Sequence, residues 1–130
     1  MTPRIALPRL VVLAIAVAVA GCGGATQGFD RAPASLDPAS PTIAAEDVAF
    51  DRTELAVPAD EPFILVFENR ESIAHNVAIY ADAAFQDRRF EGAIFGGPST
   101  RWYPVAALAP GRYVFVCDLH RSMRGIVVAA

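Results

Sequence analysis

The chain has 130 residues, enough for one small domain with a single core but not for two such domains. It contains no lysine, and 14 acidic residues against 11 arginines give a net charge of −3. A basic stripe of the kind that binds nucleic acid is therefore missing, and we expect no nucleic-acid partner.

Residues 1–21 have the composition of a targeting segment. Arg4 and Arg9 supply positive charge before an unbroken apolar stretch over residues 10–20. That stretch is shorter than the roughly 20 residues that a helix needs to cross a bilayer, which favours a cleaved signal peptide over a membrane span. The following Val19-Ala20-Gly21-Cys22 resembles a bacterial lipobox, although an ordinary secretory cleavage site is the alternative.

The lipobox resemblance implies that Cys22 is lipidated and becomes the first residue of the mature protein. Residues 22–41 are rich in Gly, Ala, Pro and Ser, with scarcely any large apolar side chain, as is typical of a flexible linker. We therefore expect a lipid-anchored flexible tether over 22–41 and a folded, monomeric domain over 42–130. The expected location is the extracytoplasmic face of a bacterial membrane, in the periplasm or at the cell surface.

From residue 42 onward, short apolar runs alternate with turn residues. This pattern predicts an all-β fold, a Greek-key β-sandwich of about seven to eight strands. Residues 81–91 are the least strand-like part and are expected to form a short helix or an irregular excursion. The expected strands are 42–50, 54–57, 63–68, 75–80, 93–95, 101–105, 112–117 and 125–128.

Four side chains suited to binding a soft metal are concentrated in the second half of the chain. Cys117, His120 and Met123 lie within seven residues, and His75 lies about forty residues upstream. The chain holds only two histidines, two cysteines and two methionines. Two imidazoles, a thiolate and a weak axial thioether are the ligand set of a blue-copper electron-transfer site.

The redox environment supports a metal role for Cys117. With Cys22 acylated, Cys117 has no partner for a disulfide within the chain, although it lies in an oxidising compartment. Metal ligation explains why such a cysteine is present. Asn76, next to His75, is expected to hydrogen-bond the loop near Cys117 or Asp118 and so to hold the two halves of the site together.

The segments His75-Asn76-Val77 and 113–125 (YVFVCDLHRSMRG) resemble a cupredoxin of the plastocyanin/amicyanin type. The resemblance covers roughly residues 42–130. It implies one type 1 copper per chain, with His75, Cys117 and His120 as equatorial ligands and Met123 as the axial ligand. It also implies that His120 reaches the surface and passes the electron. Leu119 and Arg121 flank this histidine, where many relatives carry a proline beside it.

These features predict a membrane-tethered carrier of single electrons between redox protein partners, and not an enzyme. A multicopper oxidase needs more histidines, and a binuclear copper centre needs two cysteines in one loop. A copper storage or delivery module and a metal-free binding sandwich are the alternatives. His120, Arg121 and Arg124 are the expected docking residues, although the two arginines are explained equally well as solubilising charges.

Overall fold

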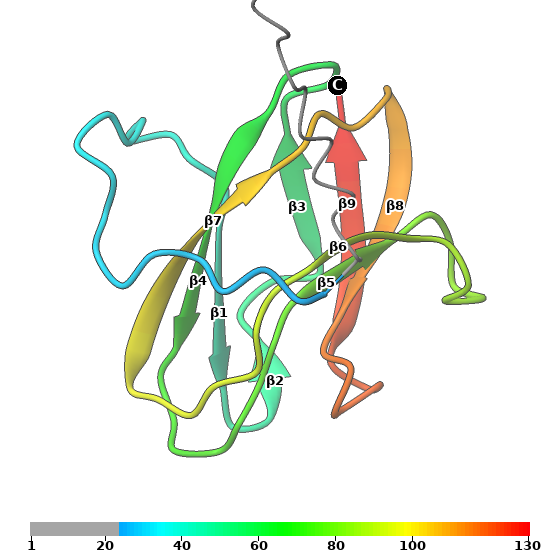
Figure 1. The fold of residues 1–130 in the computed structure, drawn as a ribbon. Helices are drawn as coiled ribbons and strands as arrows, with labels where there is room; N and C mark the ends of the chain where they lie inside the picture. Colours follow the sequence, from blue (N-terminus) through cyan, green and yellow to red (C-terminus); the bar gives the residue numbers. More distant parts are fainter. Residues whose placement is uncertain (1–23) are drawn as a thin grey trace, which may run out of the picture.

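The computed structural model describes residues 24–130, so the expected signal peptide and Cys22 lie outside the described residues. Two β-sheets face each other in this part of the chain (Figure 1), which confirms the expected all-β sandwich. Nine strands are present in the described residues instead of the eight expected: the strand over 42–50 is divided by a turn, one further strand forms at 88–91, and 93–95 is not a strand. None of residues 24–130 forms a helix long and apolar enough to cross a membrane. The strands are β1 (Thr42–Glu46), β2 (Ala49–Phe50), β3 (Glu54–Val57), β4 (Phe63–Asn69), β5 (Ala78–Tyr80), β6 (Arg88–Glu91), β7 (Ser99–Val105), β8 (Gly111–Val116) and β9 (Arg124–Ala129).

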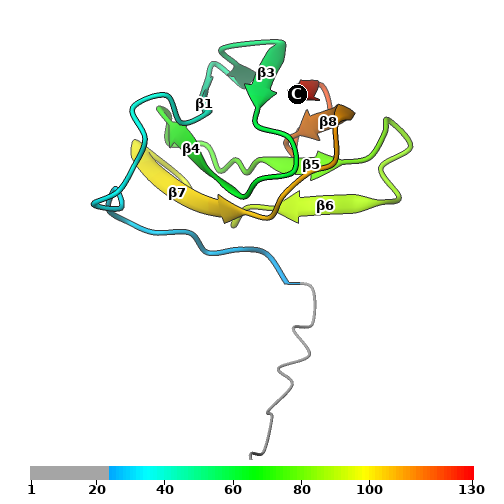
Figure 2. The same ribbon diagram turned by 90° about the horizontal axis from the view of Figure 1, so that it is seen from above.

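The first sheet has the order β2-β1-β4-β7 and the second the order β3-β9-β8-β5-β6 (Figure 2). Each sheet contains one parallel pair, β1 with β4 and β3 with β9, among antiparallel neighbours. The strands β6 and β7 are edge strands, and they lie on the same side of the sandwich.

The core lies between the sheets and follows the alternation of inward and outward side chains along each strand. Phe63, Leu65 and Phe67 of β4 are buried on one face, as their spacing predicts. Phe50 packs edge-on against Phe67 and Phe115, with ring centroids 6.3 and 5.3 Å apart. These aromatic contacts join the two sheets.

Two further expected strands, 75–80 and 93–95, differ from the structure. The expected strand 75–80 is regular only in β5, because His75 pairs with Phe95 in an isolated bridge. For the same reason 93–95 is not a strand, and β6 forms earlier in the chain instead. Within the expected excursion over 81–91, residues 81–87 are irregular and the rest form β6.

The segment Thr26–Phe29, which we call the strap, lies outside the two sheets but is hydrogen-bonded to both (Figure 2). Thr26 forms a bridge with Gly92, and Phe29 forms one with Trp102 of β7. Part of the expected flexible tether is therefore bound to the domain. The composition of residues 22–41 predicts flexibility because they include scarcely any large apolar side chains, whereas the strap is attached by main-chain hydrogen bonds.

Candidate metal centre

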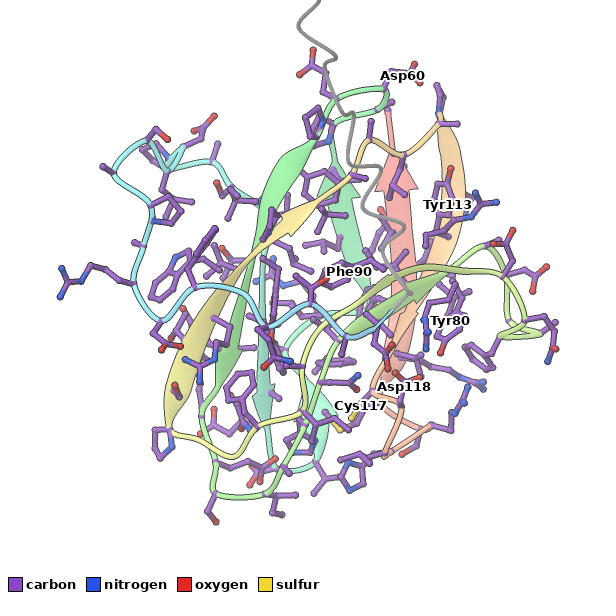
Figure 3. All side chains as sticks on the ribbon, viewed as in Figure 1. Asp60, Tyr80, Phe90, Tyr113, Cys117 and Asp118 are labelled. Atoms are coloured by element: carbon purple, nitrogen blue, oxygen red, sulfur yellow. The ribbon has the colours of Figure 1, made fainter. Side chains whose placement is uncertain are left out.

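Three ligand-type atoms meet at one end of the sandwich, which we call the site end (Figure 3 labels Cys117). The Nδ1 atoms of His75 and His120 are 3.1 Å apart. The Sγ atom of Cys117 is 3.7 Å from Nδ1 of His75 and 3.6 Å from Nδ1 of His120. Metal bonds to imidazole nitrogen and thiolate sulfur are about 2.0 and 2.3 Å long. Each edge of the triangle is shorter than two such bonds end to end, so the three atoms fit around one ion.

His75 is buried and is positioned by main-chain pairing. Its amide donates to the carbonyl of Phe95, and the amide of Phe95 donates back, both at 3.1 Å. The loop that precedes it is fixed by Asn69, which is 1% exposed. The amide group of Asn69 donates to the carbonyls of Ile73 and Phe95 at 2.8 Å each, and its oxygen accepts from the amide of Glu71.

The carboxylate of Glu71 sets the direction of the His75 ring. Its Oε1 atom lies 2.7 Å from Nε2 of His75 and also accepts from the amide of Val48 at 2.9 Å. The Val48 amide is the main cause of a lowered pKa of the Glu71 carboxyl, which partial burial opposes and His75 reinforces. Because an ionised carboxylate only accepts, Nε2 of His75 carries the hydrogen. In the neutral ring the lone pair is then on Nδ1, which lies 3.7 Å from Sγ of Cys117.

The loop between β8 and β9 brings the other candidate ligands together. The amide of Cys117 donates to the carbonyl of Met123 at 2.9 Å, which closes the loop at its base. Inside it, the amide of His120 donates to the carbonyl of Cys117, and the amide of Met123 donates to that of His120. Cys117 is 0% exposed and Met123 2%, whereas His120 is partly exposed. The loop therefore buries both sulfur atoms and presents an imidazole at the surface.

Asn76 joins the two halves of the site. Its side-chain oxygen accepts from the amide of Asp118 at 2.8 Å, and its Nδ2 donates to Oδ2 of Asp118 at 2.9 Å. Because Asp118 follows Cys117 directly, this pair of bonds fixes the cysteine-bearing loop to the strand that follows His75. Asn76 is 0% exposed, so water does not compete for these bonds.

The family model described as cupredoxin-like domain matches residues 11–129, nearly the whole chain. The chain belongs to the cupredoxin-like domain family. No match was found among curated protein sequences.

Solved structures show the same fold. An auracyanin from Roseiflexus castenholzii is 23% identical, with 68% of this chain and 94% of that chain covered and a TM-score of 0.60. Auracyanin A of Chloroflexus aurantiacus, described as a blue copper protein, is 22% identical over 68% and 96% of the two chains, with a TM-score of 0.59. An amicyanin from Paracoccus versutus is 21% identical over 75% and 87%, with a TM-score of 0.56.

The loop between β5 and β6 (81–87) packs against the loop between β8 and β9, which we call the ligand loop. The hydroxyl of Tyr80 donates to Oδ1 of Asp118 at 2.8 Å (Figure 3). The pKa of Tyr80 is raised, chiefly by burial and secondly by this hydrogen bond. The ring of Phe85 packs edge-on against Tyr80 at 5.3 Å, and the guanidinium of Arg121 lies 4.7 Å from the Phe85 centroid. Arg121 is therefore held in place by an aromatic ring, while Arg124 begins β9 as an exposed residue.

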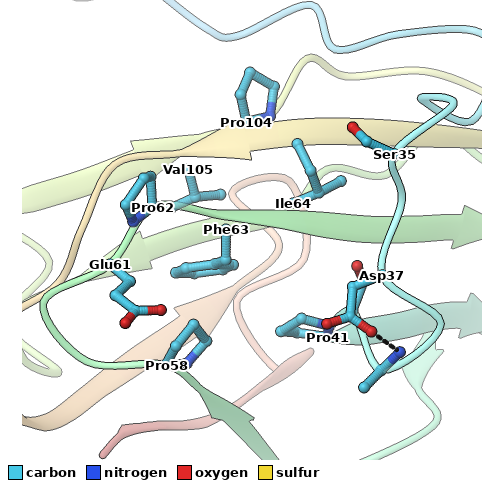
Figure 4. A pocket seen from close by; sticks show the side chains of 12 residues that line it. Ser35, Asp37, Pro41, Pro58, Glu61, Pro62, Phe63, Ile64, Pro104 and Val105 are labelled. Carbon is cyan, nitrogen blue, oxygen red and sulfur yellow. Dashed lines mark hydrogen bonds between the residues drawn. The ribbon is translucent and has the colours of Figure 1, made fainter.

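A hollow of about 570 Å³ lies between the segment before β1, the β3–β4 turn and the end of β7 (Figure 4). It contains no histidine or cysteine and is separate from the metal-ligand cluster. Four prolines form much of its wall, namely Pro41, Pro58, Pro62 and Pro104.

The sequence pattern identifies the residues of the cluster but not Glu71 and Asn69, which position them. Glu71 lies four residues before His75, and a ligating histidine commonly donates its second ring N–H to a carboxylate. A search for acidic residues near His75 could have found it. Asn69 gives no such signal, because its role depends on the carbonyl of Phe95, far along the chain.

Proposed function

We propose that the protein binds one type 1 copper ion and carries single electrons outside the cytoplasm. The ligands are His75, Cys117, His120 and Met123. The observation that carries this proposal is the triangle of two Nδ1 atoms and one Sγ atom, closed by edges of 3.1, 3.6 and 3.7 Å. Copper would supply a centre that gains and loses one electron.

The protein residues give this site its fixed shape. Glu71 orients the His75 ring, and the hydrogen bonds between Asn76 and Asp118 fix the loop that carries Cys117. The backbone bonds within the loop hold His120 and Met123 relative to the cysteine. A site that keeps one geometry in both oxidation states exchanges electrons with little reorganisation. Because this site performs no bond chemistry on a substrate, the protein is a carrier and not an enzyme.

Electrons enter and leave at the partly exposed edge of His120. Three large exposed apolar side chains adjoin the site residues along the chain: Leu119 precedes His120, Ile73 lies two residues before His75, and Ile94 precedes Phe95, which pairs with His75; they are 49, 42 and 52% exposed. Apolar surface of this kind suits transient contact with another protein. Arg121 and Arg124 add positive charge at its margin, so the redox partner is expected to present an apolar surface with acidic residues.

Lipid on Cys22 holds the carrier at the extracytoplasmic face of a bacterial membrane. The support is the sequence around Cys22, which resembles a lipobox. A monomeric domain that is confined to a membrane reaches membrane-bound redox partners by diffusing in two dimensions.

The copper assignment is tested with Cu(II) added to the metal-free protein. We expect an intense blue thiolate-to-copper absorption band and a narrow parallel hyperfine splitting in the EPR spectrum. Cys117→Ser should abolish both, because a hydroxyl oxygen does not form the covalent thiolate bond. A pale wild-type complex of ordinary tetragonal character would contradict a type 1 site.

The same loaded protein separates a carrier from a copper storage or delivery module. The candidate sulfur ligands are buried, and only His120 has an exposed edge, so copper should remain bound through many redox cycles. Transfer of copper to a modest chelator as fast as electron exchange would support delivery instead.

A further inference from the structure

The strap is attached to the exposed edges of both sheets at once. The amide of Thr26 donates to the carbonyl of Glu91 at 2.7 Å, and its own carbonyl accepts from the amide of Ala93 at 2.8 Å. Three residues later, Phe29 exchanges two main-chain hydrogen bonds with Trp102 of β7, at 2.9 and 3.2 Å. Four hydrogen bonds thus hold a short segment across the side where β6 and β7 lie.

The packing beneath the strap requires a glycine. Gly28 has φ of +71°, in the left-handed region, and a Cβ atom there would lie 2.7 Å from the ring of Tyr103. The backbone of the strap therefore rests directly on the Tyr103 ring. Tyr103 is fully buried, and this burial raises its pKa to about 12. The strap can therefore dock in this way only because residue 28 is a glycine.

Docking of the strap shortens the connection to the lipid. If all residues of the 22–41 segment were free, a fully extended chain could hold the domain about 65 Å from its anchor, at roughly 3.3–3.6 Å per residue. Only four peptide units separate Cys22 from Thr26, and they span at most about 14 Å. The surface around Thr26 must then stay close to the membrane.

We propose that the strap holds the β6–β7 side of the domain against the lipid surface, with the site end facing sideways along the membrane. This inference rests on the proposed lipid on Cys22. The strap crosses the β6–β7 side, whereas the Cys117–Met123 loop lies at an end of the sandwich (Figures 1 and 2). A redox partner in the same membrane can therefore reach His120 without displacing the domain from the lipid.

The two arginines of β6, on the membrane-facing side, are paired with acidic residues. Arg88 pairs with Glu91 at 2.8 Å and Arg89 with Asp87 at 2.6 Å. The side is thus held by its short connection and not by attraction to anionic lipids. Vesicles of zwitterionic phosphatidylcholine are sufficient to orient it.

The test uses the acylated, copper-loaded full-length mature protein on phosphatidylcholine vesicles that contain headgroup-nitroxide lipid. A fluorophore is placed by Ala106→Cys, beside Gly24 and β6, or by Ala56→Cys, on the opposite edge strand β3; both alanines are exposed. Cys117 is buried and does not react. We expect the Ala106 label to be quenched several-fold more than the Ala56 label. Equal quenching of both labels would overturn the proposal.

Two strap variants show whether the strap causes the orientation. Gly28→Val should release the strap and remove the difference between the labels, while Gln27→Val, at an exposed strap position, should preserve it. A long Gly-Ser insertion between Gly24 and Ala25 serves as a second variant that leaves the domain unaltered, and it should also reduce the difference. A difference that survives both changes would contradict the role of the strap.

The mass of the mature protein distinguishes failure of the lipid anchor from failure of the proposed orientation. A missing acyl mass would contradict the lipid anchor of the proposed function and, with it, this orientation. An acylated protein whose two labels are equally quenched would contradict the orientation alone.

Discussion

The two loops that supply the site differ in how they are held and in what they expose. The His75 loop is fixed from several directions, by Asn69, by Glu71 and by main-chain pairing with Phe95, and its histidine is 0% exposed. The ligand loop after β8 is held by three main-chain hydrogen bonds within itself and by three bonds that join Asp118 to Asn76 and Tyr80, and its histidine is partly exposed.

This difference assigns separate tasks to the two halves. The His75 half fixes one candidate ligand and shields it from water, so we expect it to control the shape and the electronic properties of the proposed copper site. The other half buries both sulfur atoms and presents one imidazole at the surface, so we expect it to control contact with the proposed redox partner. Asn76 and Asp118 connect the halves and keep their relative position constant.

The largest effect on the His75 half is expected from Asn69→Ala. This change removes three hydrogen bonds, so that the Phe95 carbonyl keeps only the His75 amide as a donor and the Ile73 carbonyl and Glu71 amide lose their Asn69 partner; leaving a buried polar group unsatisfied costs about 1–3 kcal/mol. We expect the free energy of unfolding to fall by about 3 kcal/mol in urea titrations, together with a weakened blue absorption. Ile73→Ala, in the same loop but at an exposed position, is the matched control and should cost less than about 1 kcal/mol. Equal losses for the two variants would show that Asn69 does not fix this loop.

Met123→Gln tests the ligand loop. An oxygen donor favours Cu(II) more than a thioether does, so the coloured site should remain but its reduction potential should fall. A tenfold change in relative affinity corresponds to about 59 mV for one electron, and we expect a decrease of one or two such steps in a spectroelectrochemical titration. An unchanged potential would show that Met123 is not the axial ligand. A backbone carbonyl near Ala74 would then take its place.

Glu71→Gln is the corresponding change in the His75 half, with a smaller expected effect. The carboxylate stabilises positive charge on the His75 ring and hence favours Cu(II). The amide keeps the size and an acceptor oxygen but loses the negative charge. We expect the reduction potential to rise by less than about 59 mV, with little change in the absorption spectrum. Glu54→Gln, on the far edge strand β3, should leave the potential unchanged. A fall in the potential of the Glu71 variant would contradict this electrostatic role.

The difference between the two loops also explains what could be predicted from sequence. The residues of the metal cluster stand out because the chain holds so few histidines, cysteines and methionines, and three of them share one loop. Core strands such as β4 follow directly from alternating apolar residues. The bond between Asn76 and the loop after Cys117 could be expected because Asn76 adjoins His75.

Spacing along the chain does not predict the contacts that hold Asn69 and Glu71 in place, because these contacts join distant segments. Asn69 acts through the carbonyl of Phe95, and Glu71 is itself held by the amide of Val48. Composition predicts a flexible strap because it describes side chains alone. The strap is attached by main-chain hydrogen bonds and by close packing at Gly28, which has no side chain. The contact of Phe85 with Arg121 depends on a loop that has no regular pattern.

The smallest expected effect concerns the charges beside His120. If two molecules exchange electrons through this edge, Arg121 and Arg124 of one face those of the other and repel them. Added salt should accelerate self-exchange, because the Debye length falls to about 10 Å at 0.1 M ionic strength. The double substitution Arg121→Ala, Arg124→Ala should raise the low-salt rate a few-fold and flatten its salt dependence. NMR line broadening in mixtures of oxidised and reduced protein measures this rate.

The control for this experiment lies at the other end of the sandwich. Arg112, near the start of β8, carries the same charge but belongs to the end opposite the ligand loop. Because Arg112→Ala changes the net charge without changing the surface around His120, it should leave the self-exchange rate nearly constant. Arg121 is positioned over Phe85, so its removal alone should have more effect than an unanchored surface charge. If Arg112→Ala accelerated exchange as much as the double substitution, net charge and not the His120 edge would govern the encounter.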